Sequence, residues 1–315
     1  MISLSDIEHA YKTLKPVVHK TPLLSSRTFN DLTGNEAYFK AENFQRIGAF
    51  KFRGAYNAIA SLTEAQKCGG VIAHSSGNHA QGVALAAKLF GIKAVIVMPH
   101  NSVKSKVDAT KSYGAEIVFC PDSTDDRERM TDDLIAKHGY TLIHPYANEK
   151  LIVGQGTLVM EIFQELKDLD YLFVPIGGGG LISGCAIAAK NLFPKIKVIG
   201  VETEGANDAY QSFREKRIVK LKSCSTIADG MRTLSIGTLN FEIITQYVDD
   251  VITIKDDDIF PMMKFFFERM KIVVEPTGAV APAAVMTNVL KLHGKKVCSV
   301  ISGGNVDPEL FKKII

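Results

Sequence analysis

One lysine in this 315-residue sequence stands between two aromatic residues, in a segment suited to covalent chemistry. Phe50 and Phe52 flank Lys51 within Gly-Ala-Phe-Lys-Phe-Arg-Gly-Ala, residues 48–55. Aromatic neighbours can exclude water from the amine and lower its pKa, which suits a lysine to form a Schiff base with a carbonyl compound. A lysine is more often a solvated surface group. This segment alone therefore leaves both interpretations open.

Four consecutive glycines follow an apolar segment and precede a helical pattern. The backbone N–H groups of Gly177, Gly178, Gly179 and Gly180 can converge on one point, and the N-terminus of the next helix adds positive potential. The run predicts a phosphate-binding loop, with a flexible turn as the plainer alternative. The Walker and GxGxxG patterns are absent from it. Glu202 ends the next strand, about where an acid that binds the ribose of a nicotinamide dinucleotide would stand.

Two other polar clusters also follow apolar segments. Ser75, Ser76 and Asn78 belong to Ser-Ser-Gly-Asn-His-Ala-Gln-Gly, residues 75–82. Their hydroxyl, amide and turn N–H groups can bind a carboxylate and a ring oxygen, or they can simply cap a helix. His79, taken alone, is typical of a structural histidine. Ser302 opens Ser-Gly-Gly-Asn after the last strand and can hydrogen-bond a pyridine nitrogen, or form only a turn.

A possible metal site is less evident. Glu202, Asp208 and the carbonyl of Ala206 can form an oxygen-rich site for a divalent cation. From spacing alone, two solvated acids on a loop are the favoured interpretation. The eight histidines show no HExxH spacing, and no GxSxG segment occurs, so zinc hydrolysis and serine-hydrolase chemistry have no support.

These clusters sit where alternating strands and helices would place a ligand. Strand-like apolar runs cover residues 71–74, 94–98, 117–120, 172–176, 197–201 and 297–301, and helical patterns cover 81–89, 103–113, 127–138 and 181–192. This alternation predicts a parallel sheet with helices on both faces, and strands that are apolar on both sides. Open parallel sheets bind ligands beyond the carboxyl ends of their strands, which is where the clusters lie.

Composition narrows the class of protein. Hydrophobic residues make up 46% and charged residues 23%, which excludes disorder, collagen and coiled coil. Lys plus Arg exceed Asp plus Glu by 37 − 34 = 3, too few to indicate nucleic acid or an anionic membrane as a partner. The five cysteines form no CxxC pair, and we find no secretory signal or membrane-spanning run. We expect a soluble cytoplasmic protein.

The motifs taken in order resemble one family. FKxRGA, SxGNHAQG, GQGT (154–157), GGGGL, ADG (228–230), EPTGA (275–279) and SGGN are similar to segments of the tryptophan-synthase-type (fold type II) pyridoxal-phosphate enzymes, and within them to the serine racemase and serine/threonine dehydratase branch. The resemblance covers about residues 7–307. It implies an α/β fold of two domains, each with an open, mostly parallel sheet flanked by helices. Residues 1–68 and 148–315 would form the large cofactor domain, and 69–147 a small mobile domain. It also implies a homodimer.

The resemblance also implies roles in binding pyridoxal 5'-phosphate and substrate. Lys51 would hold the cofactor as an internal aldimine. The other cofactor residues would be Phe50 against the ring, Asn78 at the 3-hydroxyl, the backbone of Gly177, Gly178, Gly179 and Gly180 at the phosphate, and Ser302 at the ring nitrogen. Substrate would be bound by Ser75, Ser76, His79, Arg127 and Thr233.

Two further sites are implied in the same way. Glu202, Ala206 and Asp208 match the divalent-cation site of the racemase branch, which would take Mg²⁺ or else Ca²⁺ or Mn²⁺. Residues that match a nucleotide site for ATP are Ser26, Gln81 and Tyr113, whereas Arg46 stands where racemases carry lysine.

The implied activity is racemisation of serine together with ammonia release from β-hydroxy amino acids. Lys51 would remove the α-proton, and Ser76, which is commonly alanine in threonine dehydratases, would return a proton on the opposite face. Arg127 can grip a second carboxylate, which makes threo-3-hydroxyaspartate dehydratase an alternative main activity. A nicotinamide-dependent oxidoreductase and a non-catalytic amino-acid-binding protein are the alternatives from other classes.

Overall fold

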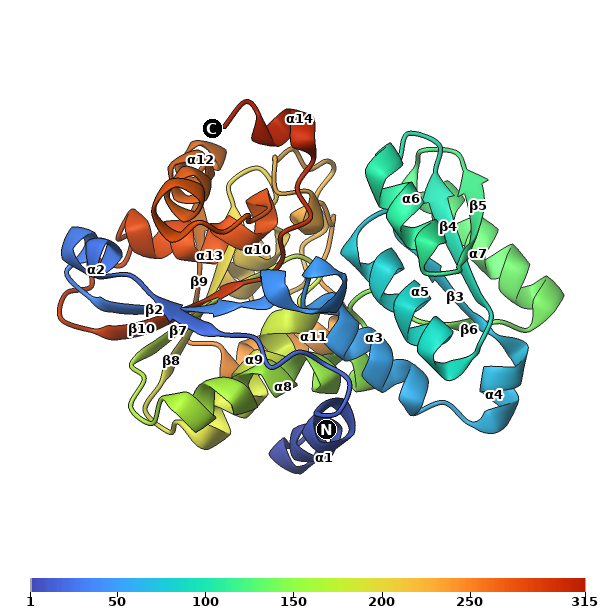
Figure 1. The fold of residues 1–315 in the computed structure, drawn as a ribbon, viewed down its shortest axis with the longest axis horizontal. Coiled ribbons are helices and arrows are strands. Elements are labelled where there is room, and N and C mark those ends of the chain that lie inside the picture. The colour runs from blue at the N-terminus through green and yellow to red at the C-terminus, as the bar shows by residue number, and fades with distance from the viewer. Residues whose placement is uncertain (1, 315) are drawn as a thin grey trace.

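Two open sheets form the framework of the protein in a computed structural model that describes residues 2–314 (Figure 1). The larger sheet has six strands in the order β1-β2-β10-β7-β8-β9. Their bounds are β1 Leu23–Ser25, β2 Glu36–Ala41, β10 Lys296–Ile301, β7 Tyr171–Pro175, β8 Lys197–Thr203 and β9 Asp250–Ile254. Among these described strands, only β1 and β2 pair antiparallel. The predicted α/β class with mostly parallel sheets is confirmed.

The smaller sheet lies in the second lobe, on the right in Figure 1, and its four strands are all parallel. Their order is β5 (Glu116–Cys120), β4 (Ala94–Pro99), β3 (Val71–His74) and β6 (Thr141–Leu142). Strand β4 is buried throughout, but β5 is an edge strand that leaves Phe119 exposed. The expectation of strands buried on both faces is therefore wrong for β5, because an edge strand has a neighbour on one side only. The domain boundaries and the mobility of the smaller unit stay predictions.

Helices cover both faces of the larger sheet, as expected. One face packs against α1 (Leu4–Leu14), α8 (Glu149–Glu165), α9 (Gly180–Leu192), α10 (Asp208–Glu215) and α11 (Thr238–Tyr247). The other face packs against α2 (Arg27–Thr33), α12 (Asp256–Phe265) and α13 (Pro276–Met286). A short helix, α14 (Pro308–Phe311), follows the last strand.

The smaller sheet is covered in the same way. Helices α3 (Lys51–Ala60), α5 (Asn78–Phe90) and α6 (Lys104–Ser112) contribute to the core on one of its faces. Helix α7 (Thr124–His138) packs on the other face, and α4 (Glu64–Gly69) precedes β3. Helix α3 lies where the two lobes meet (Figure 1). No helix within residues 2–314 is long and apolar enough to cross a membrane.

Glycines allow three helices to approach one another closely near the centre of the molecule. A Cβ at Gly154 of α8 would overlap the backbone of α3 at Arg53 and Gly54. A Cβ at Gly156 would likewise overlap the backbone of Gly184 on α9. The GQGT segment therefore sets the spacing between α8 and its two neighbours, and through them the positions of the residues that begin α3 and α9.

Candidate active site

One cavity of about 700 Å³ lies beyond the carboxyl ends of β3, β7 and β10. The structure brings to this cavity every residue for which the sequence predicts a role in cofactor or substrate binding. Those residues are Phe50, Lys51, Ser75, Ser76, Asn78, His79, Arg127, Gly177, Gly178, Gly179, Gly180, Thr233 and Ser302. These residues come from segments that follow strands of the six-stranded and of the four-stranded sheet. A ligand bound here would therefore contact both lobes. Their individual roles stay predictions.

Lys51 is the first residue of α3 and directs its amine into the cavity. The Nζ atom donates a hydrogen bond to the carbonyl oxygen of Pro145 at 2.7 Å and lies 5.3 Å from the ring centroid of Phe50. Burial lowers the pKa of Lys51 to about 8. A substantial fraction of this amine is therefore neutral near pH 8, as nucleophilic or basic chemistry requires.

Only one of the two flanking phenylalanines contributes to this environment. Phe52 is fully buried in the core between α3 and α5, where its ring contacts Tyr56 and the guanidinium of Arg46. The expectation that both rings enclose the amine is therefore wrong for Phe52. Consecutive side chains on a helix point about 100° apart, so Lys51 and Phe52 cannot share a face.

The four glycines form a close-fitting backbone cradle at the start of α9. A Cβ at Gly178 or Gly180 would press against Tyr146, and one at Gly177 would meet the carbonyl oxygen of Gly230. Gly179 caps the helix with φ +92°, a conformation that L side chains rarely adopt. The loop thus places backbone donors at a helix N-terminus, and this geometry fits a phosphate group.

Substituting Gly178 with alanine tests this cradle. Because the added methyl group would overlap the Tyr146 ring, we expect the affinity for pyridoxal phosphate to fall about tenfold or more, which corresponds to about 1.4 kcal/mol. Equilibrium dialysis of the cofactor measures the change. Gly114→Ala is the control, because a Cβ there meets only open space and the position lies outside the cavity, so even with the backbone strain of its positive φ it should leave the cofactor affinity unchanged. Equal affinities in both variants would contradict the cradle.

Ser302 and Asn78 present polar groups to the same space. The Ser302 hydroxyl is buried and has no hydrogen-bond partner in the described part of the chain, as expected if it meets the ring nitrogen of a ligand. The Asn78 amide donates to Glu275 Oε1 at 2.8 Å, and its oxygen accepts from Asn305 at 2.9 Å. These contacts fix Asn78 while leaving its second amide hydrogen for a ligand.

Glu275 is a buried acid of the cavity to which the sequence motifs assign no role. Its Oε2 atom has no hydrogen-bond partner among the described residues. Burial, reinforced by the nearby Asp229, raises the pKa of Glu275 to about 7. Its position in the EPTGA motif at the start of α13 is the only signal that could have identified it.

The loop after β3 carries the predicted substrate residues. The Ser75 hydroxyl accepts a hydrogen bond from the backbone of Gly77 at 3.3 Å, and Ser76 lines the cavity. His79 is 2% exposed, and its Nε2 lies 2.8 Å from the carbonyl of Ile143, which makes that nitrogen the donor. Burial, with a smaller effect of Lys51, lowers the pKa of His79 well below its usual value. The ring therefore anchors the loop as a neutral imidazole.

The turn at residues 144–147, which no motif predicts, supports both Lys51 and the glycine cradle. The His144 Nδ1 atom accepts hydrogen bonds from the backbone N–H groups of Tyr146 at 3.3 Å and Ala147 at 2.9 Å. Burial and the nearby His74 lower the pKa of His144 to about 4, which keeps it an acceptor. The turn presents the Pro145 carbonyl to Lys51 and the Tyr146 ring to the glycine loop. No glycine or serine cluster marks this segment, so its sequence carries little signal.

The predicted metal ligands are buried, not solvated. Glu202 is fully buried and accepts hydrogen bonds from the backbone of Ala209 at 3.2 Å and Tyr210 at 2.7 Å, at the start of α10. Both carboxylate oxygens of Asp208 are buried without a hydrogen-bond partner in the described chain. Burial raises the pKa of Asp208 to about 7, and burial with the nearby Asp208 raises that of Glu202 well above its usual value.

This environment overturns the interpretation of the two acids as solvated groups on a loop. Two buried carboxyl groups this close must either take up a proton or be paired with a cation, and two carboxylates with the carbonyl of Ala206 suit a hard divalent cation. Within residues 2–314, no group of three or more His, Cys, Asp or Glu side chains could hold a metal. A cation bound here would therefore need the backbone carbonyl and water as its remaining ligands. Glu202 does not line the main cavity, which removes the ribose-binding role considered for it.

The four residues predicted to contact a nucleotide lie on different elements. Ser26 caps α2 by accepting a hydrogen bond from Phe29 N at 3.4 Å, and it lines a second cavity of about 510 Å³. Arg46 packs over Phe52, Gln81 is buried in α5, and Tyr113 follows α6. Of the four, only Ser26 lines that second cavity.

Comparison with known proteins places the chain among enzymes. The family model described as "Pyridoxal-phosphate dependent enzyme" matches residues 14–303. An L-threo-3-hydroxyaspartate ammonia-lyase of Saccharomyces cerevisiae is 48% identical over 98% of this chain and 95% of its own length. A serine racemase of Schizosaccharomyces pombe is 47% identical over 97% and 95%. The solved structure of maize serine racemase superposes with a TM-score of 0.96 at 41% identity, covering 99% of this chain and 96% of its own.

Proposed function

The chain belongs to the pyridoxal-phosphate dependent enzyme family, and from that premise we propose that it racemises serine and releases ammonia from β-hydroxy amino acids. The observation that carries this proposal is the single cavity shared by Lys51, Ser76, the glycine cradle and Ser302. The relatives named as serine racemase and ammonia-lyase support it, at 42–48% identity.

The residues present fit the cofactor. The backbone of Gly177 to Gly180 would hold its phosphate, the unpartnered Ser302 hydroxyl would meet its ring nitrogen, and Lys51 would bind its aldehyde carbon. When bound, pyridoxal phosphate supplies a conjugated ring that spreads the negative charge left after the α-proton is removed. A neutral serine at the ring nitrogen does not enforce its protonation as a carboxylate would, which favours elimination or reprotonation over amino-group transfer.

The side chains of the cavity account for the proton movements. Lys51, whose pKa is lowered to about 8 by burial, removes the α-proton of the substrate. Return of a proton from Ser76 on the opposite face gives the mirror-image amino acid. Loss of the β-hydroxyl as water, followed by hydrolysis that returns that water, gives a 2-keto acid and ammonia. Ser75 and Ser76, on the loop after β3, would hold the substrate carboxylate.

A substrate panel tests the proposal directly. L-Serine, L-threonine and L-threo-3-hydroxyaspartate are incubated with the protein loaded with pyridoxal phosphate. Chiral chromatography measures the D-enantiomer, and a coupled dehydrogenase assay measures the keto acid. We expect D-serine from L-serine and keto acid with equimolar ammonia from at least one substrate. Absence of both products from all three substrates would contradict the proposal.

Arg127 supports 3-hydroxyaspartate as a second candidate substrate. Arg127 lies on α7 and lines the cavity. The relative that is 48% identical is named L-threo-3-hydroxyaspartate ammonia-lyase. A guanidinium can bind the second carboxylate through two hydrogen bonds. We expect Arg127→Ala to lower kcat/KM for 3-hydroxyaspartate about 100-fold, equivalent to about 2.7 kcal/mol, but that for serine only a few-fold. Initial rates with both substrates measure this, and an equal loss for both would refute a side-chain-carboxylate role.

Mg²⁺, or else Ca²⁺ or Mn²⁺, is the cation we propose for Glu202, Ala206 and Asp208. Binding to the folded state alone should stabilise the protein by about 2.7 kcal/mol at a hundredfold excess over Kd. We therefore expect a chelator to lower Tm by several degrees and added Mg²⁺ to restore it, as measured by differential scanning calorimetry. Asp208→Asn removes one of the two anionic ligands of the proposed site. The Tm of this variant should therefore no longer respond to the chelator or to Mg²⁺. A parent Tm that is insensitive to both would exclude the site.

Three further expectations stay predictions: a homodimer, a cytoplasmic location and ATP as an effector. The ATP site rests on Ser26 in the second cavity and on Arg46, Gln81 and Tyr113 elsewhere in the fold. Arg46 retains the positive charge of the lysine that racemases carry, and its Nε atom is buried without a partner among the described residues.

A further inference from the structure

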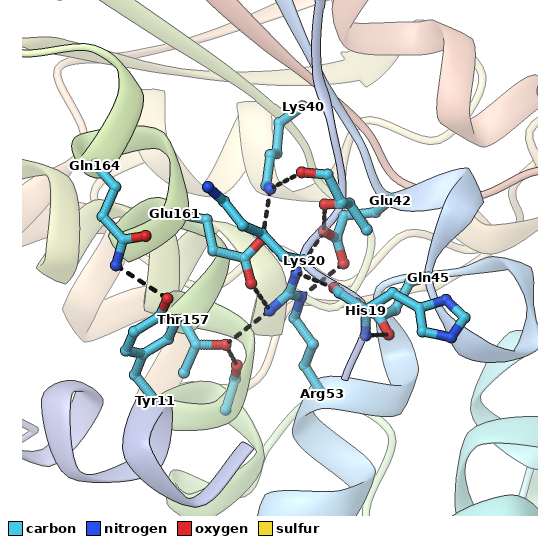
Figure 2. Close-up of polar contacts among 12 residues, drawn as sticks. Tyr11, His19, Lys20, Lys40, Glu42, Gln45, Arg53, Thr157, Glu161 and Gln164 are labelled. Atoms are coloured by element: carbon cyan, nitrogen blue, oxygen red, sulfur yellow. Dashed lines mark hydrogen bonds and ion pairs between the residues drawn. The ribbon is translucent and has the colours of Figure 1, made fainter. Parts of the chain in front are cut away.

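Four charged side chains meet in the interior, outside the cavity (Figure 2). Lys40 lies on β2, Glu42 directly after it, Arg53 on α3 and Glu161 on α8. Each of these side chains is at most 1% exposed. We call these four residues the buried ion cluster. Their formal charges sum to zero, and nothing in the chemistry of the cavity uses them.

Arg53 is the centre of the cluster and grips both acids through paired hydrogen bonds (Figure 2). Its guanidinium donates to Glu42 at 2.7 and 2.8 Å, and to Glu161 at 2.8 and 2.9 Å. The planar fork of arginine fixes the directions of these bonds, which a lysine cannot reproduce. Although burial alone would raise it, Arg53 holds the pKa of Glu42 below its usual value, so the acid stays ionised.

Lys40 and two threonines complete the hydrogen bonding of the cluster. Lys40 Nζ donates to Glu161 at 2.5 Å and to the carbonyl of Thr21 at 2.7 Å. The Thr21 hydroxyl donates to Glu42 at 2.6 Å, and Arg53 approaches the Thr157 hydroxyl at 3.5 Å. Every charge is thus paired, as a buried ion network requires.

Stability alone gives a poor reason for such a cluster. Desolvation of buried ions largely offsets their attraction, and well-packed apolar residues of similar volume are often as stabilising. What the ions add is direction, since hydrogen bonds between fixed partners define one relative orientation of the elements that carry them.

The cluster lies on α3, which begins at Lys51, and on β2 and α8, which contact β10 and α9, the elements next to the other predicted cofactor contacts. Arg53 is two residues after Lys51 in the first turn of α3. Lys40 pairs in register with Val300 on β10, two residues before Ser302. Glu161 lies on α8, whose Gly156 packs directly on the backbone of α9, the helix that begins at the glycine cradle. The amine, the ring-nitrogen hydroxyl and the phosphate cradle therefore share one internal anchor.

We propose that the buried ion cluster sets the distances between Lys51, Ser302 and the glycine cradle, with Arg53 as its positioning residue. One hydrogen bond, donated by Phe50 N to Ser302 O at 3.0 Å, completes this frame on the cavity side. The inference rests on pyridoxal phosphate as the ligand of the proposed function. It assigns to FKxRGA and GQGT the joint task of holding the three contacts at the spacing the cofactor needs.

Arg53→Lys in the cofactor-loaded protein tests this inference, because it keeps the charge but loses the fork. We expect the dissociation constant of pyridoxal phosphate to rise about tenfold or more and the visible circular dichroism of the bound cofactor to weaken. We also expect kcat to fall more than KM rises, because misplacement affects the reacting geometry. Met262→Ala is the matched control. It opens the buried core at α12, on the far side of the larger sheet, and should lower Tm while leaving cofactor affinity and dichroism unchanged.

The outcomes separate this inference from the proposed function. If the parent protein binds no pyridoxal phosphate, the proposed function fails. If the parent binds it and Arg53→Lys lowers only Tm, as Met262→Ala does, the positioning role is refuted. Should Arg53→Lys not fold, the double variant Lys40→Met/Glu161→Gln decides, because it removes one positive and one negative charge and leaves Arg53 paired with Glu42. Weakened affinity and dichroism in that variant support the proposal, and parent-like values of both refute it.

Discussion

Replacing Lys51 with alanine should lower kcat for both racemisation and ammonia release by about 10⁴-fold or more, because one amine serves as covalent attachment and as general base. The buried position of this amine, its contact with Pro145 and its lowered pKa of about 8 support both roles. No other lysine within residues 2–314 shares this set of features together with the glycine cradle. Coupled assay of keto acid and chiral chromatography of serine measure the two activities.

The control for this variant is Lys104→Ala. Lys104 is an exposed residue at the start of α6, and among the described residues its one ion pair is with Asp108, one turn later on the same helix. Its removal should leave both activities at the parent level. If Lys51→Ala kept more than about a tenth of kcat in either reaction, the assignment of general base to Lys51 would be wrong.

Ser76→Ala should separate the two activities. Removing its hydroxyl should lower racemisation by about 100-fold or more, because general acid catalysis at the second face is lost. Ammonia release should change far less, since Lys51 alone removes the α-proton in that reaction. Parallel progress curves for D-serine and keto acid from the same L-serine mixture give the ratio.

The neighbouring serine provides the comparison. The Ser75 hydroxyl accepts a hydrogen bond from Gly77 N and supports the loop, so Ser75→Ala should lower both activities by similar factors. If Ser76→Ala kept racemisation together with ammonia release, another group of the cavity would have to be the second proton donor.

The predicted strands and helices were those with strong local signals. Runs such as 172–176 are apolar and end at glycines, and all six predicted strands and four predicted helices are present in the structure within a few residues. Helix α8 has no such signal, because its Gly154 and Gly156 are required by close packing and interrupt its helical pattern. Strands β1 and β6 have three and two residues, too few to show a period.

The cavity was predictable because its residues gather in glycine-rich loops after strands, whereas the groups that support it were not. Glutamates are usually exposed, and nothing in the sequence marks Glu42 and Glu161 as buried. Only the fold shows that both pair with Arg53 in the interior. His144 and Tyr146 act through backbone contacts that leave no motif. Burial of Asp208 depends on contacts between distant segments, so its spacing from Glu202 suggested a solvated loop instead. Tertiary contacts decide burial, and sequence spacing reports them poorly.

Reduction of the cofactor-loaded protein with borohydride, followed by peptide mass spectrometry, identifies the residue to which the cofactor is bound. We expect reduction to remove the visible band and to leave the mass of reduced pyridoxal phosphate on the peptide that contains Lys51. Attachment to a different lysine, or an active protein whose Lys51 peptide stays unmodified, would contradict it.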